Sequence, residues 1–335
     1  MLSRVAESVY WMNRQIERAE NVARAAETTL DLALEGTIVP GRLWKALVCT
    51  FGDQADFWTR HGLADQAHVI EFLAFDAENP NSIFRCLQAA RENARTVRDM
   101  ISSPMWEEIN KCYLFVRGAA AGRGQLDHPR EFFDEVKRAS QLIAGVTDAT
   151  MSHGEAWHFA RMGRLVERAD KTSRVLDVEH FFHPPAEPGG GAGDPDDVVA
   201  SANGDAGASA AVHWPAVLQS ASALEMYRKQ YGAVTRRNVA EFLVLDRVFP
   251  RAMHFCLIKS EESLLAVTGG TKGSYSNPAE QQLGRLRSEL DYAHIDEILG
   301  GRGGLHQFID AFQLRLNRAS DAIFDTFFAL RPVAK

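Results

Sequence analysis

The chain has 335 residues, of which 46% are hydrophobic and 24% charged, and its formal net charge is −7 at pH 7. This balance is typical of a globular protein and excludes disorder over most of the chain. The negative charge disfavours nucleic-acid binding through bulk electrostatics.

The chain contains no obvious targeting or membrane signal. No apolar run reaches the roughly 20 residues that span a bilayer. Charged residues from Arg4 onward interrupt any apolar secretory segment. The four cysteines have neither CxxC nor disulfide-scaffold spacing, which is typical of a reducing compartment. We therefore expect a cytoplasmic protein that contacts neither membrane nor nucleic acid.

The predicted elements are helices along the whole chain. Apolar residues from Val5 to Ala33 recur in alternating steps of four and three, which predicts one long amphipathic helix. The same spacing predicts helices over Leu87–Ile101 and Phe308–Ile323, and no stretch alternates with period two. The predicted breaks contain glycine or proline and fall at Gly36–Pro40, Asn79–Pro80, Gly118–Pro129, Gly269–Pro278 and Gly300–Gly304. The sequence therefore predicts an all-α fold.

Residues 183–213 differ from the rest of the chain in composition. They include four prolines, six glycines and five acidic residues, with no lysine or arginine. Such a segment cannot bury enough apolar area to offset the entropy lost on ordering. We predict a mobile insertion that carries most of the net negative charge.

Two internal matches indicate that the chain is a tandem duplication. Residues 12–24 and 162–174 share six of thirteen positions at an offset of 150. A second block, beginning at Trp44 and Trp214, shares eleven of 44 positions at an offset of 170. The insertion accounts for the change of offset. We expect two helical repeats, residues 1–155 and 156–335, fused into one bundle with pseudo-twofold symmetry.

The first match contains a charged pattern that the two copies share. Arg14–Glu17 and Glu20–Arg24 have the spacing of ion pairs along one helix, which predicts a solvated face. Solvated charges exchange easily for similar ones, so their identity between copies favours another role. They either form buried ion pairs or line a cleft between the copies, and arginine suits both. The charged residues identical in both copies are Arg14/Arg164, Glu17/Glu167, Arg18/Arg168 and Arg24/Arg174.

These segments resemble a known bacterial family. MLSRVAESVYWMNRQIERAENVAR at the start and GRLVERADKTSRVLD in the second copy are similar to the Alpha-E domain family, which takes its name from an ER motif. ARENARTVRD, MWEEIN and FLVLDRVFPRAMHFCL are similar to the same family. The resemblance covers the chain apart from residues 183–213 and implies a helical fold.

The resemblance also implies partners. The family is associated, by gene neighbourhood and by fusion, with circularly permuted ATP-grasp proteins and transglutaminase-like proteins. ATP-grasp enzymes form amide bonds through an acyl-phosphate. The resemblance therefore implies a place in a peptide- or amide-forming system, without supplying catalytic residues.

Further arginines are candidate binding residues. Arg91, Arg95 and Arg98 form a basic stripe at helical spacing that the second copy lacks. Arg302 lies in the GGRGG loop before a predicted helix, whose amides could hold an anion. A solvated helix face and a flexible interhelix loop are the alternatives.

We predict neither a metal nor a cofactor. His180 and His183 follow Asp177 at a helix end and could in principle collect a cation. The chain has no HExxH pattern, and no Ser-His-Asp or Cys-His triad follows from spacing. Cys86 and Cys256 match between copies within apolar stripes, which favours buried packing.

Three functions remain open. The first is a helical accessory component of an ATP-grasp-dependent system that holds a small carboxylate or amino-acid-like ligand against Arg18, Arg168 and neighbouring arginines. The second is an enzyme for acyl transfer with Glu17 or Glu167 as acid or base, for which burial would raise the carboxyl pKa. The third is an interaction module in which these residues are purely structural.

Overall fold

A computed structural model describes residues 1–36, 38–122, 128–177 and 214–329. Within these ranges the chain is helical and has no strand, which confirms the predicted all-α class. The predicted insertion at 183–213 lies outside the described residues.

The first part of the chain runs from the N-terminus to residue 150. Its helices are α1 (Ser3–Glu35), α2 (Pro40–Phe51), α3 (Gln54–His61), α4 (Gln66–Ile70), the π-helical turn η1 (Glu71–Phe75), α5 (Ile83–Thr96), α6 (Ser103–Ala121) and α7 (Pro129–Thr150).

The second part begins with a long helix at residue 155. Its helices are α8 (Glu155–Leu176), α12 (Leu224–Gln230), α13 (Arg236–Leu245), α14 (Met253–Thr268), α15 (Pro278–Asp291), α16 (Ile295–Gly300), α17 (Gly304–Ile323) and the π-helical turn η3 (Phe324–Phe328). Residues 214–220 are also helical. The predicted repeat boundary falls in the first turn of α8.

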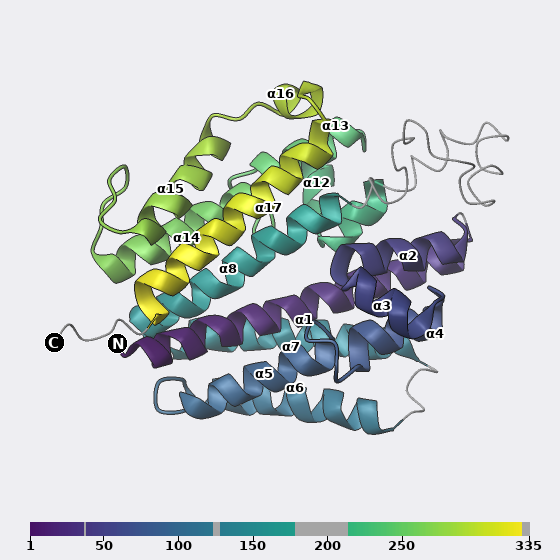
Figure 1. The fold of residues 1–335 in the computed structure, drawn as a ribbon, viewed down its shortest axis with the longest axis horizontal. Coiled ribbons are helices and arrows are strands. Elements are labelled where there is room, and N and C mark those ends of the chain that lie inside the picture. Colours follow the sequence, from purple (N-terminus) through teal and green to yellow (C-terminus); the bar gives the residue numbers. More distant parts are fainter. Residues whose placement is uncertain (37, 123–127, 178–213, 330–335) are drawn as a thin grey trace.

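The central feature of the fold is the pair α1 and α8, which run side by side in the same direction (Figure 1). Their first turns lie together, since the amino group of Met1 donates to Glu155 Oε2 at 2.7 Å. Further along, Gly163 of α8 approaches the backbone of Tyr10 so closely that a Cβ atom would lie 2.3 Å from the Tyr10 carbonyl oxygen. The two helices that carry the repeated motif are therefore each other's neighbours.

Other helices cover the two sides of this central pair. Helices α5, α6 and α7 pack on the α1 side, while α14, α15 and α17 pack on the α8 side (Figure 1). One hydrophobic cluster runs through both sides and includes Trp44, Phe133, Tyr227, Phe242 and Phe312. The motif residues therefore lie in the middle of the molecule.

Glycine and proline mark the helix ends largely as predicted. Helix α1 ends before Gly36, which adopts a left-handed φ of 67°, and Pro40 begins α2. Helix α6 continues three residues beyond Gly118. The stripe predicted as one helix to Ile101 does not stay helical, because α5 ends at Thr96. Ile101 is nevertheless buried.

None of the described helices combines the length and the apolar character that crossing a membrane requires.

Candidate functional site

The repeated charged residues meet at the interface between α1 and α8. Glu17 and Glu167 are 2% and 0% exposed, and each follows a buried apolar residue, Ile16 or Val166, on its helix. The apolar stripe that buries Ile16 and Val166 draws the adjacent glutamates into the interior. Of the two alternatives left by the sequence, the described residues show buried ion pairs.

Each motif arginine binds the glutamate of the other motif. Arg168 donates through Nε and Nη2 to Glu17, at 2.8 and 2.7 Å. Arg18 donates through Nε and Nη2 to Glu167, at 2.7 and 3.1 Å. Both pairs have the two-pronged geometry that makes arginine–carboxylate bonds strong and directional. The ER motif therefore works across the interface and not within one helix.

Arg14 also pairs across the interface. Its Nε donates to Glu167 at 2.8 Å, where the helical spacing had predicted a pair with Glu17. The other predicted intrahelical pair is present, because Arg24 donates to Glu20. Spacing along one helix cannot reveal an acceptor that a second helix supplies, which is why the first pair was mispredicted.

Each glutamate receives one further cation, but from a different position in the repeat. Lys171 Nζ lies 3.4 Å from Glu167 Oε1, whereas Arg251 Nη1 lies 3.2 Å from Glu17 Oε1. The position matching Lys171 is Asn21, and the position matching Arg251 is Asn81. Both cations come from the second half and both asparagines from the first, so each glutamate site has a cation at one of these positions and asparagine at the other.

A second layer of acidic residues lies one turn further along the helices. Asp170 accepts from Lys171 and Arg174, both at 3.0 Å. Glu20 accepts from Arg24 and, at 2.5 Å, from Arg251. This layer extends the ion-pair cluster toward the C-terminal ends of α1 and α8.

Arg24 reaches beyond this layer to an unusual backbone position. Its guanidinium donates to the hydroxyl of Ser222. Among the described residues, Ser222 is the one non-glycine residue with positive φ, at 45°. Such conformations cost about 1–3 kcal/mol and persist only when surrounding contacts hold them.

The surrounding charges hold both motif glutamates in the ionised form. Burial alone would raise the pKa of Glu17, but Arg168, Arg251 and the Asn21 amide lower it to about 2. Burial opposes ionisation of Glu167 as well, yet Arg14, Lys171 and Arg18 hold its pKa well below the usual range. A carboxylate this acidic cannot exchange protons near pH 7 as a general acid or base must.

Positive charge exceeds negative charge in this cluster. Its eight cations face four carboxylates; the cations are Arg14, Arg18, Arg24, Arg164, Arg168, Lys171, Arg174 and Arg251, and the carboxylates are Glu17, Glu20, Glu167 and Asp170. The Nε atoms of Arg24 and Arg164 are buried without a hydrogen-bond partner among the described residues. Burial and a neighbouring arginine lower the pKa of both guanidinium groups. The excess favours an additional anion.

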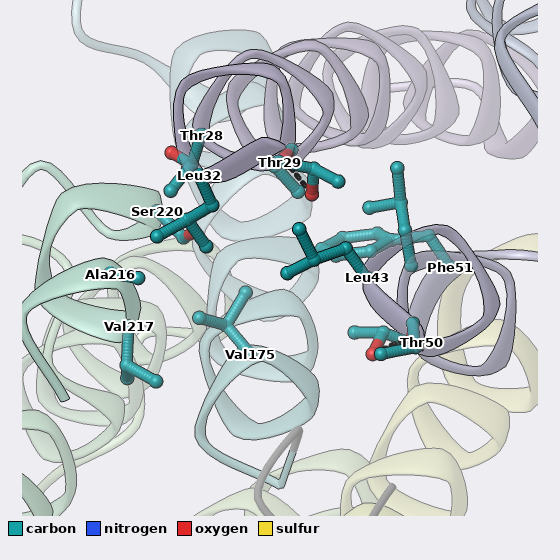
Figure 2. A pocket seen from close by; sticks show the side chains of 13 residues that line it. Thr28, Thr29, Leu32, Leu43, Thr50, Phe51, Val175, Ala216, Val217 and Ser220 are labelled. Carbon is teal, nitrogen blue, oxygen red and sulfur yellow. Dashed lines mark hydrogen bonds between the residues drawn. The ribbon is translucent and has the colours of Figure 1, made fainter. Parts of the chain in front are cut away.

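A small apolar cavity lies beyond the cluster, at the C-terminal ends of α1 and α8 (Figure 2). Its volume is about 50 Å³, and its wall contains Thr28, Leu43, Val175 and Ser220. None of its thirteen lining residues carries an ionisable side chain. The motif glutamates therefore do not face this cavity.

The remaining predicted binding residues lie elsewhere. Arg91 and Arg95 lie on α5, where Glu92 pairs with both, and Arg98 lies in the turn just after this helix. Arg302 is exposed in the turn before α17. The structure does not bring these four arginines to the cluster between α1 and α8.

One group with metal-ligand chemistry escaped the sequence reasoning. Asp177, His306 and Asp310 place a ligand atom each within 4.8 Å of one another. His306 Nδ1 lies 2.9 Å from Asp177, and Nε2 lies 3.4 Å from Asp310, so both ring nitrogens already face carboxylates. Asp177 and His306 are 129 residues apart, too far for a spacing motif. His180 and His183 lie outside the described residues.

The two cysteines that match between the copies, Cys86 and Cys256, lie beside the motif arginines Arg18 and Arg168. Cys86 and Cys256 donate to the carbonyl oxygens of Pro80 and Pro250. Burial raises the pKa of both thiols to about 12, so neither forms a thiolate readily. The predicted packing role agrees with their full burial.

These observations define a helical protein in which two parallel central helices exchange arginine–glutamate pairs. The chain belongs to the Alpha-E family, described as a predicted alpha-helical domain with a conserved ER motif, whose model matches residues 1–328.

Similar curated proteins come from mycobacteria. They include Uncharacterized protein Mb2597 of Mycobacterium bovis and Uncharacterized protein Rv2567 of Mycobacterium tuberculosis, each 22% identical over 361 residues. The match covers 98% of this chain but 37% of each relative, so the chain spans little more than a third of their length. No solved structure matches the chain significantly.

Proposed function

We propose that the chain is a non-catalytic accessory component of a cytoplasmic ATP-grasp-dependent system that forms amide or peptide bonds. The observation that carries this proposal is the complete pairing of Glu17 and Glu167 in the interior. Such residues have a structural role, because they fix two helices relative to each other. In this proposal, the partner protein catalyses the reaction.

The rival enzymatic function fits this geometry poorly. Acyl transfer with a motif glutamate needs a carboxyl pKa near neutrality and access for substrate. Both carboxylates instead have lowered pKa values, and both are enclosed by donors. The accessory function requires neither access nor proton exchange.

The arrangement also supports a duplicated architecture with pseudo-twofold symmetry. The two ion pairs are reciprocal: Arg18 binds Glu167 and Arg168 binds Glu17. A twofold axis between α1 and α8 would produce this arrangement. The further cation at Glu167 is Lys171 and the one at Glu17 is Arg251, a difference that divergence of two equivalent copies would produce.

A ligand of this system would be anionic. The cluster's four excess cations favour a small carboxylate or an amino-acid-like molecule near its edge, where Arg174 is 36% exposed. Arg18 and Arg168 are already engaged by glutamates and are poor candidates for direct contact.

The proposed partner is a circularly permuted ATP-grasp protein, alone or with a transglutaminase-like protein. This part rests on the family resemblance. The greater length of the mycobacterial relatives supports it, since a module covering 37% of a chain works beside other domains.

The test measures ADP release and amide product by an ATP-grasp protein encoded beside this chain, over a panel of amino acids and small carboxylates. We expect turnover to depend on this chain. Arg168→Lys and Glu167→Gln should lower the melting temperature, and residual turnover should track the folded fraction. Equal turnover without the chain would overturn the accessory function. Loss of turnover in a Glu167→Gln variant that still folds and binds the partner would instead support the enzymatic function.

A further inference from the structure

A ladder of arginine and aromatic side chains covers the outer face of the α5–α6 hairpin. The guanidinium of Arg98 lies 4.8 Å from the Trp106 ring centroid, and that of Arg91 lies 5.8 Å from the same ring. Arg91 also lies 5.0 Å from the Tyr113 ring, and Arg117 lies 5.6 Å from it. We call these five residues the arginine ladder.

The helical repeat explains this regularity. Arg91 lies on α5 and Arg98 lies seven residues further on, in the turn just after α5, while Trp106 and Tyr113 are seven residues apart on α6. Seven residues make about two turns and roughly 10 Å of rise. This spacing separates the Trp106 and Tyr113 rings by about two turns of α6, and the Arg91 guanidinium lies near both of them.

The ladder holds its arginines in a form ready for binding. Stacking on an aromatic ring restricts a long flexible side chain and leaves the edges of the guanidinium free to donate. Among the described residues, Arg98 and Arg117 at the two ends have no carboxylate within ion-pair distance. Both are exposed. Their hydrogen-bond donors are available to a ligand.

The ladder belongs to the first half of the chain alone. At the offset of 170, Arg91 and Arg98 correspond to Glu261 and Thr268. Glu261 is buried and pairs with Arg287 inside the α14–α15 packing. Both halves contribute to the central cluster, whereas the ladder occurs in the first half alone. A ligand of the ladder would therefore contact only that half.

The chemistry of the face favours carboxylates over nucleic-acid bases. Bases stack on free aromatic faces, but Trp106 and Tyr113 each already carry two guanidinium groups, and Tyr113 also stacks with Phe84. Arginine, tryptophan and tyrosine are the residues enriched where protein interfaces gain most of their energy.

We propose that the arginine ladder is a docking surface for an acidic, Asp/Glu-rich segment of a partner protein. Carboxylates of the segment bind the outward edges of Arg98 and Arg117, whereas Arg91 already donates to Asn110 and Glu92. The proposal does not depend on which protein supplies the segment, so it stands apart from the proposed ATP-grasp function.

The test uses a fluorescently labelled oligoglutamate peptide and the full chain, with binding followed by fluorescence polarisation at low and physiological salt. We expect Arg98→Gln with Arg117→Gln to weaken binding about tenfold. The matched control is Arg237→Gln with Arg315→Gln, which removes the same charge from exposed arginines that pair with Asp296 and Glu289. This control should bind like the wild type.

A third variant separates charge from geometry. Arg98→Lys with Arg117→Lys keeps the charge but loses the planar fork, so we expect only part of the binding to remain. Because all these positions are exposed, circular dichroism melting should show unchanged folding. Equal losses in the ladder and control variants, or no binding by the wild type, would overturn the proposal. Tighter binding of a single-stranded oligonucleotide than of the peptide would replace it with a nucleic-acid surface.

Discussion

The Glu17 carboxylate lies in the protein interior, where an unpaired charge would cost several kcal/mol. Three groups compensate its burial by donating hydrogen bonds to it: the fork of Arg168, a nitrogen of Arg251 and the amide of Asn21. Glu167 has an equivalent set. Both glutamates therefore stabilise the fold only while their donors remain in place.

Removing the charge of Glu167 should be strongly destabilising. Glu167→Gln leaves Arg14, Arg18 and Lys171 facing one another without a counter-charge, and we expect the free energy of unfolding to fall by about 3–5 kcal/mol. Urea denaturation measures this loss. The matched control is Glu289→Gln in the exposed pair with Arg315, which should cost less than about 1 kcal/mol. Similar small losses for both variants would contradict the paired, buried state of Glu167.

The pH dependence of stability follows from the lowered pKa of Glu17. A carboxyl group with pKa 4.5 when unfolded and about 2 when folded stabilises the protein fully above pH 4.5. This stabilisation is lost as pH falls through about 2. We expect the free energy of unfolding to decline over this window, and to decline less steeply in Glu17→Gln. Parallel acid titrations of the two proteins would disprove the assignment.

The sequence identified the residues of the ion-pair cluster better than it predicted which residues pair with each other. Identity between copies separated Glu17 and Arg18 from ordinary surface charges. Their crosswise pairing depends on how two helices pack, which spacing within either helix cannot reveal. Arg251 was missed as a motif partner, although its match to Asn81 and the match of Lys171 to Asn21 were a usable signal.

At the scale of the helices, a close backbone contact between α1 and α8 restricts how the two helices pack. Gly163→Ala would place a Cβ atom 2.3 Å from the Tyr10 carbonyl oxygen, which neither backbone can absorb without moving. We expect a loss of about 1–3 kcal/mol. Gly145→Ala in α7 is the control, because nothing lies within 4 Å of that position. It should be neutral or stabilise by up to about 1 kcal/mol.

The further cations at the two glutamates, Arg251 at Glu17 and Lys171 at Glu167, give a second prediction for these helices. Arg251→Asn should destabilise the protein, because Glu17 and Glu20 lose a donor. Adding Asn21→Lys to that variant recreates the arrangement around Glu167 and should recover much of the loss. Asn21→Lys alone adds a cation without removing one and is the control. Thermal melting compares the three variants. Failure of the double variant to recover stability would contradict the equivalence of the two glutamate sites.

Helix ends were more predictable than helix packing. Gly36, Pro40, Gly269 and Pro278 stop or start helices through their own backbone preferences, so a single sequence contains the necessary information. The break at Thr96 was missed because buried side chains continue across it to Ile101. The spacing of apolar residues indicates which side chains are buried, not whether the backbone is helical. The spacing therefore continues through a turn whose side chains still face the core.

At the scale of the molecule, the cluster links parts of the chain that are distant in sequence. Glu17 depends on Arg168 and Arg251, and Glu167 depends on Arg14 and Arg18, so neither half satisfies its own glutamate. The all-α class followed from periodicity alone. The parallel placement of α1 beside α8 did not, since it is decided by long-range packing.

The mutual dependence of the halves gives a prediction for fragments. Residues 1–155 expressed alone should not fold stably, because the fragment buries Glu17 without either arginine partner. Mixing it with residues 156–335 should restore helical signal and a cooperative melt, measured by circular dichroism. Independent cooperative melting of either fragment would contradict this dependence.

The central claim is that the ER motif is a clamp between two helices, and a double-mutant cycle across the interface tests it most directly. The cycle compares Glu17→Gln, Arg168→Gln and the double variant with the wild type by urea denaturation. We predict a coupling energy between the two residues near the upper end of the range for close pairs, about 3 kcal/mol. A coupling energy below about 0.5 kcal/mol would show that the two side chains act independently and would contradict the clamp.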